Sequence, residues 1–345
     1  MMKEIKELVR ISNEIGKLKD LVQASGGNIS IKTVDGKMII KASGFTFSEM
    51  TEKSGFSIVD YKKLIRFFIN RSDSQIAEEN EGAYNETLIN SIVDSKLPRP
   101  SMEAGMHVFL NRVVVHTHPV MTNILNCMEN GEKIIRELFS YIHPEIMLVD
   151  YKNPGYHLAR EIKKKISSYE SKNGIKPEVI FLKNHGLIMS KDDSSNCVSV
   201  TLGLNKKVYM YLKDNFDIES FSIPELKLKN NIYFSDDVLI KRFIQHLKEN
   251  ESTLSKFLIP DDAIYCPAEI SKGNFNEFNK NKITVTQNGA FFPWDKKKST
   301  KIFEMFVSKA YITLMIDKIG KISYLQDKDV NYLQNMESEK YRQTL

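Results

Sequence analysis

The sequence has little cysteine: its 345 residues include three, Cys127, Cys197 and Cys266. The number is odd, no Cys-x-x-Cys motif occurs, and each cysteine lies in a largely apolar setting. This excludes a disulfide framework and fits a reducing compartment. Long hydrophobic runs are also absent, because no window approaches about 18 uninterrupted apolar residues and residues 1–20 contain no signal-peptide core. We therefore expect a cytoplasmic protein without a membrane span.

Charge of one sign is not in large excess. The chain has 49 lysine and arginine residues against 44 aspartate and glutamate residues, a net charge of +5, and they are spread along its length. Nothing resembles the dense basic face of a nucleic-acid-binding protein, so we expect neither a nucleic-acid nor a membrane partner. We interpret the run Asp-Lys-Lys-Lys at 295–298 as a solvated turn, with binding of a phosphate or polyanion as the less favoured alternative.

The composition is that of an ordinary globular protein. Apolar residues make up 41% and charged residues 27% of the chain, which excludes a largely disordered protein. A chain of 345 residues can bury a sizeable core, and its length suggests two domains. We place them at 1–220 and 221–345, because residues 215–235 are polar and irregular and are interpreted as a linker.

The segment Val-Val-Val-His-Thr-His at 113–118 predicts a buried strand that ends in two histidines. Side chains two apart on a strand point to one face with Cα atoms roughly 7 Å apart, so His116 and His118 can converge on one metal ion while Thr117 points away. A lone histidine is more often a core or surface residue with ordinary hydrogen-bond partners than a metal ligand. Burying two imidazoles without a partner would be costly, so we favour metal ligation for this pair.

A third histidine lies in a tight turn. The sequence predicts strands at 179–183 and 187–190, with Asn-His-Gly at 184–186 between them. Gly186 suits a backbone position that cannot tolerate a Cβ. His185, held at the edge of a rigid sheet, completes a three-histidine ligand set.

A carboxylate precedes the His-x-His strand. Pro100 and Ser101 predict the start of a short helix, with Ser101 free to cap it. Glu103 and His107 would then lie four residues apart on one face of that helix. The sequence thus predicts histidines and a carboxylate at a helix–strand junction, which is what a catalytic metal site needs.

Two glycine-containing loops flank an N-terminal hairpin. An amphipathic helix over 2–22 leads into Ala-Ser-Gly-Gly-Asn at 24–28, and Ala-Ser-Gly follows the hairpin at 42–44. The strands of the hairpin, at 29–32 and 37–41, are joined by an Asp-Gly turn. Such loops expose backbone N–H groups that suit an anion, although most glycine turns are only turns.

The rest of the chain alternates strands with helices. The predicted elements are a strand at 57–60, a helix from 61 capped by Asp60, an exposed loop over 71–82, helices over 83–95 and 120–140, a strand at 146–149, a turn at 153–155, and helices over 157–170 and 194–214. Beyond the linker we predict strands at 264–266 and 283–286 and helices over 302–318 and 327–343. We find no chemistry in this second lobe and interpret its one histidine, His246, as structural.

Five motifs occur in a fixed order: Gly-Gly-Asn-Ile-Ser at 26–30, Ala-Ser-Gly at 42–44, Pro-Ser-Met-Glu at 100–103, His-Thr-His at 116–118 and Asn-His-Gly at 184–186. Together they resemble the class II aldolase/adducin family, over roughly residues 5–215. The resemblance implies an α/β fold, a three-layer αβα domain with a central, mainly antiparallel sheet, to which this chain would add a smaller C-terminal α/β lobe. The short spacing from Glu103 to His116 is most similar to the aldolase half of fusions with a short-chain dehydrogenase. No Gly-x-Gly-x-x-Gly occurs, so we expect no nicotinamide cofactor.

The resemblance also implies roles for individual residues. It makes His116, His118 and His185 the ligands of a divalent metal, most often zinc, and Glu103 the proton shuttle. Gly27, Asn28, Ser43, Gly44 and Ser101 fall where the family holds the phosphate of its substrate. The implied reaction cleaves or forms an aldol C–C bond in a sugar or sugar phosphate through a metal-bound enediolate. The family also implies a homo-oligomer, a tetramer, with a tyrosine from a neighbouring subunit that we cannot place.

Two departures weaken the implied phosphate site. Met102 replaces a serine of the family motif Ser-Ser-Glu, and Lys41-Ala42 stands where the family has Thr-Pro. The substrate is therefore expected with or without a phosphate. Alternatives within the family are an epimerase, a dehydratase or a decarboxylase acting on a related carbohydrate. An adducin-like binding module without catalysis is a further alternative, as is a second lobe that docks a partner enzyme.

Overall fold

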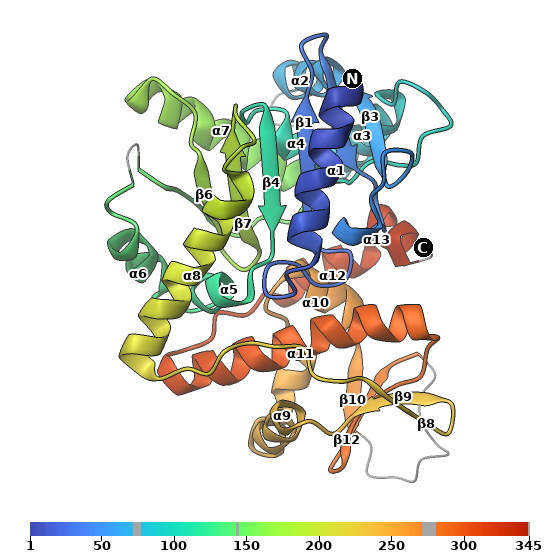
Figure 1. Cartoon of the computed structure of the whole chain (residues 1–345), viewed down its shortest axis with the longest axis vertical. Helices are drawn as coiled ribbons and strands as arrows, with labels where there is room; N and C mark the ends of the chain where they lie inside the picture. The colour runs from blue at the N-terminus through green and yellow to red at the C-terminus, as the bar shows by residue number, and fades with distance from the viewer. Residues whose placement is uncertain (72–76, 143–144, 271–280, 344–345) are drawn as a thin grey trace.

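The computed structural model describes residues 1–71, 77–142, 145–270 and 281–343, and its larger lobe is built on one sheet (Figure 1). The sheet has the order β3-β2-β1-β4-β7-β6-β5, and every neighbouring pair except β5 and β6 is antiparallel. Its strands are β1 (Asn28–Lys32), β2 (Lys37–Lys41), β3 (Phe56–Asp60), β4 (Val113–Thr117), β5 (Met147–Val149), β6 (Val179–Leu182) and β7 (Gly186–Lys191). The predicted mainly antiparallel sheet is confirmed.

Both faces of the sheet are buried, which makes three layers. On β4, Val113 and Val115 face one core with α1 (Met2–Gly16) and the start of α8 (Cys197–Phe216), whereas Val114 faces the other. Helices cover that second face: α2 (Tyr61–Asn70), α3 (Ala77–Asn90), α4 (Ala104–His107) and α7 (Tyr156–Asn173). Successive side chains on a strand alternate between faces, so an apolar strand such as β4 needs a helical layer on each side.

A second lobe with its own sheet follows α8. This sheet has the order β10-β11-β12-β9-β8. The elements of the lobe are β8 (Lys227–Lys229), β9 (Ile232–Ser235), α9 (Val238–Glu249), η2 (Glu251–Ser255), α10 (Pro260–Tyr265), β10 (Ala268–Ile270), β11 (Ile283–Thr286), β12 (Gly289–Phe292), α11 (Lys296–Ile319), α12 (Asp327–Asn335) and α13 (Glu337–Gln343). The predicted C-terminal α/β lobe is therefore present.

One apolar core joins the two lobes. Buried side chains of α5 (Val120–Asn126), such as Ile124, pack in the same cluster as Phe303 and Phe306 of α11. In Figure 1, α11 runs as a long helix along the base of the larger lobe, between it and the second sheet. Helix α8 ends at Phe216 and β8 begins at Lys227, and the shared core shows that the lobes are not separated by a free linker.

Five predicted elements were wrong, one of them the single helix over 327–343, which is divided into α12 and α13. The linker over 215–235 contains β8 and β9, and the strand at 264–266 is the end of helix α10. The single helix over 120–140 is interrupted at 127–130, where Met128 forms a β-bridge to Ile322, so α5 is followed by a separate α6 (Gly131–Leu138). The loop over 71–82 includes the first turn of α3, whereas residues 72–76 lie outside the described part of the chain. A short apolar run cannot by itself distinguish strand from helix, which accounts for the error at 264–266.

Helix α1 is also shorter than predicted, ending at Gly16 instead of residue 22. The backbone of residues 20–22 leaves the helical pattern because it binds the segment after β4. Leu21 O accepts from His118 N at 3.0 Å, and Asp20 O accepts from Val120 N at 2.8 Å. A short 3-10 helix, η1 (Phe47–Glu49), packs against Gly16, where a Cβ would lie 2.4 Å from Ser48 Oγ.

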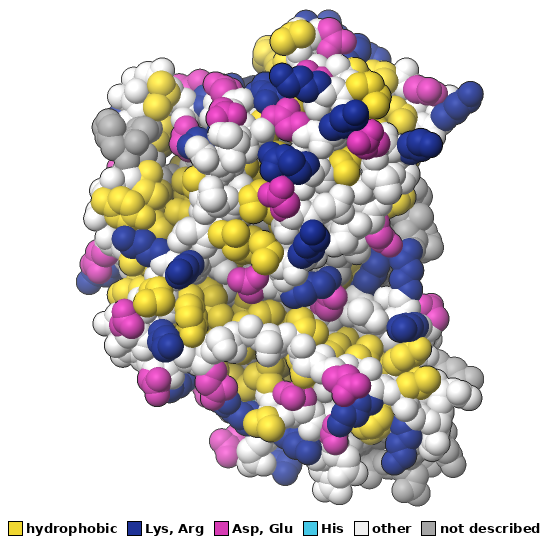
Figure 2. All heavy atoms as spheres, in the orientation of Figure 1, with side chains coloured by type: hydrophobic (Ala, Val, Ile, Leu, Met, Phe, Trp, Pro, Cys, Tyr) yellow, Lys and Arg dark blue, Asp and Glu magenta, His cyan; other side chains and the backbone are white. Residues whose placement is uncertain are grey.

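The surface carries both signs of charge. On the face shown in Figure 2, lysine and arginine side chains are interspersed with aspartate and glutamate side chains. Among the described residues, no helix combines the length and the apolar character that crossing a membrane requires.

Candidate metal centre

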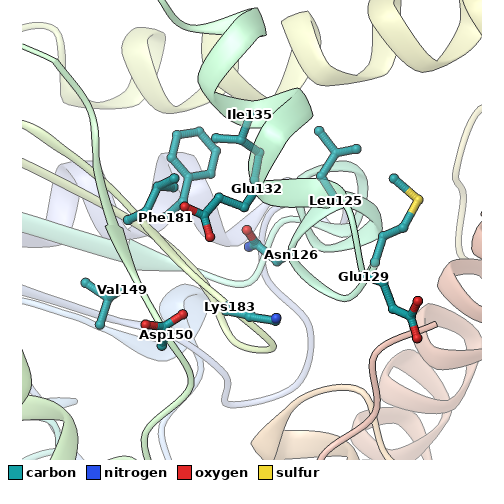
Figure 3. A pocket seen from close by; sticks show the side chains of 11 residues that line it. Leu125, Asn126, Glu129, Glu132, Ile135, Val149, Asp150, Phe181 and Lys183 are labelled. Carbon is teal, nitrogen blue, oxygen red and sulfur yellow. The ribbon is translucent and has the colours of Figure 1, made fainter. Parts of the chain in front are cut away.

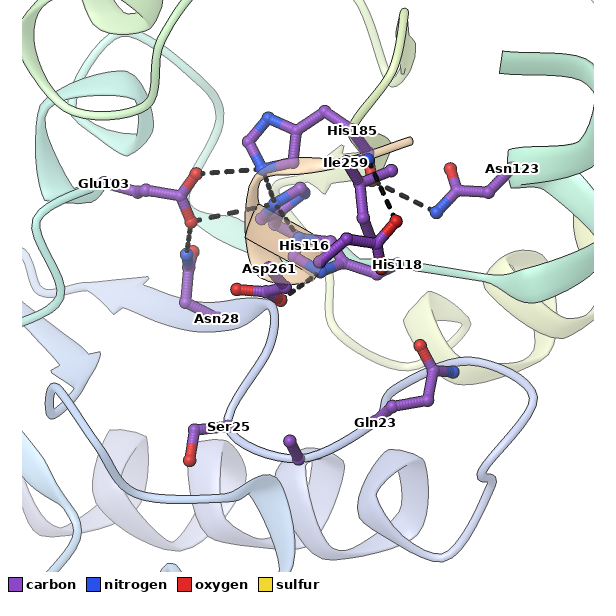
Figure 4. A network of polar contacts seen from close by, with 12 residues as sticks. Gln23, Ser25, Asn28, Glu103, His116, His118, Asn123, His185, Ile259 and Asp261 are labelled. Carbon is purple, nitrogen blue, oxygen red and sulfur yellow. Dashed lines mark hydrogen bonds and ion pairs between the residues drawn. The ribbon is translucent and has the colours of Figure 1, made fainter. Parts of the chain in front are cut away.

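Three buried histidines converge at the end of β4. His116 Nε2 lies 3.0 Å from His118 Nε2 and 3.3 Å from His185 Nε2. Each of the three residues can offer a nitrogen within 4.8 Å of the others, and none is more than 3% exposed. The sequence predicted that these three side chains share one site, and Figure 4 shows them brought together.

Strand register places His116 in this cluster. In the sheet it is paired with Asn28 of β1 on one side and Ile188 of β7 on the other. The β6–β7 turn brings His185 alongside, with Asn184 in the left-handed region at φ 51°. Gly186 permits the approach, because a Cβ there would lie 2.3 Å from Thr117 O and 2.9 Å from His118 Cδ2. The predicted need for a residue without a Cβ at Gly186 is confirmed.

Helix α5 holds the backbone of the turn. Asn123 Nδ2 donates to His185 O at 3.2 Å, and Asn126 Nδ2 donates to Gly186 O at 3.0 Å. Both amide side chains are buried. They satisfy carbonyls that a tight turn would otherwise leave without partners in the protein interior.

Glu103 lies beside two of the imidazoles. Its Oε1 is 3.2 Å from His185 Nε2, and its Oε2 is 3.7 Å from His116 Nε2. Asn28 Nδ2 donates to Oε2 at 2.5 Å from the opposite side. Burial raises the pKa of the carboxyl, but positive charge at the histidine cluster, at His116 above all, outweighs this and holds the pKa well below its usual range. Glu103 is therefore a carboxylate at neutral pH.

The sequence predicted this position for Glu103 but not its local geometry. Helix α4 begins at Ala104, so Glu103 precedes it and does not share a helix face with His107. Ser101 does not cap α4; its hydroxyl accepts from Glu103 N at 3.3 Å. His107 lies away from the cluster, with Nδ1 2.7 Å from Ser30 Oγ, and burial lowers its pKa to about 3.

The donor set fits a divalent cation. His116 Nδ1 lies 3.1 Å from Leu187 O, so this nitrogen carries the proton and the lone pair of Nε2 faces the other imidazoles. Burial lowers the pKa of His116 well below its ordinary value, which keeps the ring neutral. Adjacent nitrogen ligands of a tetrahedral zinc with Zn–N of about 2.0–2.1 Å are roughly 3.3 Å apart, close to the nitrogen separations found here. Facing lone pairs at such distances call for a cation between them.

A narrow pocket opens beside the histidines. Residues that were predicted to bind the substrate lie on its wall, namely Gly27, Ser43, Gly44 and Ser101, together with Glu103, His118 and His185. Asn28 lies behind Glu103, with its amide 3.4 Å from Ser101 Oγ. Lys41 also lines the pocket, and its Nζ donates to Phe45 O at 2.7 Å and to Ser25 O at 3.2 Å. The structure thus gathers all the predicted site residues in one place.

Comparisons with known proteins identify the family of the chain. Residues 6–212 match the family described as Class II Aldolase and Adducin N-terminal domain. The chain belongs to the class II aldolase/adducin family. It is 29% identical over 226 residues to Uncharacterized oxidoreductase YuxG of Bacillus subtilis, a match that covers 62% of this chain and 30% of that protein. The chain thus spans about a third of the length of this curated relative.

A solved structure of a class II aldolase domain shows the same fold as the larger lobe. The N-terminal class II aldolase domain of a conserved protein from Thermoplasma acidophilum superposes with a TM-score of 0.51 at 23% identity, covering 61% of this chain and 93% of that one. A sugar-phosphate aldolase from Thermotoga maritima is more distant, with a TM-score of 0.44 at 15% identity over 61% of this chain and 94% of that one. The family match ends before the second lobe begins.

The second lobe nevertheless reaches the candidate metal site, which the sequence did not reveal. Asp261 Oδ2 of α10 lies 2.8 Å from His118 Nδ1, and Pro260, Asp261 and Glu339 line the pocket. Asn184 Nδ2 donates to Leu258 O at 2.9 Å, which ties the turn that carries His185 to this lobe. The prediction that the lobe carries no chemistry missed these contacts, because none of these residues lies in a recognisable motif.

Helix α11 supports the two glycine loops of the aldolase domain. Glu304 Oε2 accepts from Ala24 N at 2.8 Å, and Lys301 Nζ donates to Gly44 O at 3.2 Å. The loops that form one wall of the pocket are therefore held by the second lobe.

A separate hollow lies next to α5 and α6, and Figure 3 shows its lining. Its inner wall includes Leu125, Ile135 and Phe181, and it is also lined by Glu132, Asp150 and Lys183. None of the three clustered histidines lines it. Two of the three clustered histidines, His118 and His185, line the pocket beside Glu103 instead.

Proposed function

We propose that this protein is a divalent-metal-dependent lyase that cleaves or forms an aldol C–C bond in a ketose or ketose phosphate. The observation that carries the proposal is the placement of Glu103 within 3.2 Å of His185 in a buried three-histidine cluster beside a pocket. Membership of the class II aldolase/adducin family supports it. Zinc is the metal we propose, since three imidazoles are a common ligand set for catalytic zinc.

Each residue has a distinct part in this proposal. His116, His118 and His185 would hold the cation, which when bound supplies Lewis-acid stabilisation of negative charge on substrate oxygens. Glu103, an ionised carboxylate, takes the proton from the substrate hydroxyl whose carbon becomes the aldehyde, or returns a proton to the carbon of the other fragment. Asn28 keeps one oxygen of Glu103 in place through its 2.5 Å hydrogen bond.

The pocket wall suits the polar end of a carbohydrate. Gly27, Ser43, Gly44 and Ser101 offer backbone N–H groups and hydroxyls on one side of Glu103, and we propose that they bind substrate oxygens. Ser25 Oγ already donates to Gly44 O at 2.9 Å, which couples the two loops. A phosphate is one candidate for this position, and a hydroxyl or carboxylate is another.

The test is a product assay on zinc-loaded protein. Candidate ketoses and ketose 1-phosphates are incubated with the protein, and aldehyde release is followed with a coupled dehydrogenase. Release of an aldehyde that stops on chelation of the metal supports the lyase. Epimerised substrate, carbon dioxide or a dehydrated product would replace the lyase with another activity of the same site. No turnover by metal-loaded protein would favour a binding module.

A further inference from the structure

We propose that Asp261, from the second lobe, is a positioning residue for the metal ligand His118. The proposal rests on the proposed metal site and assigns to it a residue beyond the family-matched part of the chain. His118 follows β4 in the first lobe, whereas Asp261 lies in α10, 143 positions further along (261 − 118). Figure 4 shows their contact at the centre of the network.

The contact fixes which nitrogen of His118 can bind a metal. Asp261 Oδ2 lies 2.8 Å from Nδ1, and the two residues are 2% and 3% exposed. At this distance a lone pair on Nδ1 would be repelled by the carboxylate oxygen, so the contact favours the tautomer with the proton on Nδ1, although the two atoms are not aligned as a full hydrogen bond. A neutral ring then presents an Nε2 lone pair, and Nε2 is the atom that lies 3.0 Å from His116 Nε2. A carboxylate behind a ligating histidine sets its tautomer and ring orientation in this way.

The three imidazoles differ in the group that lies next to Nδ1, the nitrogen that faces away from the cluster. His116 has the backbone carbonyl of Leu187, while His185 Nδ1 has no hydrogen-bond partner among the residues that the structure describes. Of the three rings, His118 is the one whose Nδ1 meets an acidic side chain. The ligand from the first lobe is therefore oriented by a charge from the second.

Glycine at position 26 accommodates this pair. A Cβ at Gly26 would lie 2.5 Å from Asp261 Oδ2 and 2.9 Å from His118 Nδ1. The first glycine of the Gly-Gly-Asn motif thus leaves room for the carboxylate, so the first lobe is shaped to receive Asp261. An incidental ion pair between two lobes would not need such a space.

Helix α10 is fixed firmly enough to position a side chain. Asp262 Oδ2 accepts from Leu258 N at 3.0 Å, and Leu258 O in turn accepts from Asn184 Nδ2 at 2.9 Å. Pro260 begins the helix, and every residue of α10 is buried. Asp261 is thus presented from a rigid element, and the same segment is bonded to the turn that carries His185.

The test measures metal affinity without turnover. Zn²⁺ is titrated against a chromophoric chelator in the full chain and in Asp261→Ala, Asp261→Asn and Asp262→Asn. Asp262→Asn is the matched control, because Asp262 is buried in the same helix and the amide keeps an acceptor oxygen for the backbone N–H groups of Leu258 and Ile259. We expect about 10- to 100-fold weaker affinity in Asp261→Ala, the usual cost of removing a partner behind a ligating histidine. Asp261→Asn retains an acceptor oxygen and should lose less, by several-fold, since a neutral amide accepts more weakly than a carboxylate.

The visible spectrum of the Co²⁺-loaded protein gives a second readout. A positioning role predicts altered absorption in Asp261→Ala and a parent-like spectrum and affinity in Asp262→Asn, even if that control melts at a lower temperature. Parent-like affinity of Asp261→Ala overturns the proposal, as does a loss in Asp262→Asn equal to that in Asp261→Ala. If Asp261→Ala does not fold, parent-like affinity of Asp261→Asn overturns it. A parent that binds no Zn²⁺ contradicts the proposed function as well, so the two failures are distinguishable.

Discussion

The carboxylate of Glu103 lies between the histidine cluster and the side-chain amide of Asn28. One side faces the imidazoles, 3.2 Å from His185, and the other accepts a 2.5 Å hydrogen bond from Asn28. A carboxylate so constrained cannot rotate freely, and its position next to the histidine cluster allows proton transfer to a substrate bound there.

Replacement of this carboxylate by an amide should separate proton transfer from metal binding. We expect Glu103→Gln to bind Zn²⁺ with parent stoichiometry but to turn over about 100- to 10,000-fold more slowly, the usual contribution of a general base or acid. The amide preserves the shape of the side chain and cannot accept the substrate proton. Steady-state kinetics together with metal analysis of the same sample measure both quantities. Turnover within a few-fold of the parent would assign the proton transfer to another group.

A substitution at Gly186 tests whether the close packing of the β6–β7 turn against β4 is needed. A Cβ there would lie 2.3 Å from the backbone oxygen of Thr117, so Gly186→Ala must displace β7 from β4. We expect a loss of about 1–3 kcal/mol in the free energy of unfolding, typical of overpacking, together with weaker metal binding. Urea unfolding followed by circular dichroism measures the first effect.

Gly203→Ala in α8 is the matched control for this test. Nothing lies within 4 Å of a Cβ at that position. Because glycine is a poor residue inside a helix, this change should stabilise the protein by about 0.5–1 kcal/mol. Equal changes in the free energy of unfolding for the two substitutions would show that the close approach of Gly186 to Thr117 is not critical.

Single residues were the most predictable part of the site. His116, His118 and His185 could be identified because two are spaced for one face of a strand and the third lies in a tight turn with a glycine. Asp261 could not be found, because a lone aspartate between a proline and another aspartate has no spacing that relates it to a histidine 143 positions earlier (261 − 118). Only the packing of the lobes brings the two together.

At the scale of elements, a buried carboxylate joins α3 to the start of α7. Glu81 Oε2 accepts from Tyr156 N at 3.2 Å, and a Cβ at Gly155, where φ is 88°, would lie 2.9 Å from Oε1. Burial raises the pKa of Glu81 from 4.5 to about 7. The predicted turn at 153–155 is therefore closed by a residue that the sequence assigned to an exposed loop.

This shift predicts a pH-dependent stability. Between about pH 4.5 and 7 the folded chain keeps a proton on Glu81 that the unfolded chain has lost, so the free energy of unfolding falls as the pH rises through this range. Relative to Glu81→Gln, which does not titrate, the parent should lose about 2–4 kcal/mol between pH 4 and pH 8. Chemical denaturation of both proteins across this range measures the difference. A difference that does not change with pH would contradict the buried, protonated state.

Helices and strands were predicted correctly where the hydrophobic periodicity was strong. The predictions failed where tertiary contacts determine where a helix ends. The β1–β2 and β6–β7 hairpins follow from alternating apolar runs joined by Asp-Gly and Asn-His-Gly. Helix α1 ends early because residues 20–22 bind the backbone after β4. Helix α5 ends because Met128 pairs with Ile322 of the second lobe. Neither partner can be recognised from the local sequence.

At the scale of the whole molecule, the site lies where two lobes meet. The first lobe supplies the histidines, Glu103 and the glycine loops, while α10 and α11 supply Asp261 and the supports of the loops. A continuous apolar core joins the lobes, so the second lobe is part of the structure that shapes the pocket. This interdependence could not be predicted from the family resemblance, which ends near residue 215.

We propose that His116, His118 and His185 together hold one divalent cation. Elemental analysis of the full chain, purified without a histidine tag, loaded with Zn²⁺ and desalted, measures this, with His116→Ala treated identically. We predict about one metal ion per chain in the parent, as for a site with a complete ligand set, and a small fraction of that in the variant. A parent with only a small fraction of an ion per chain, or a variant that keeps a full ion, would contradict the account.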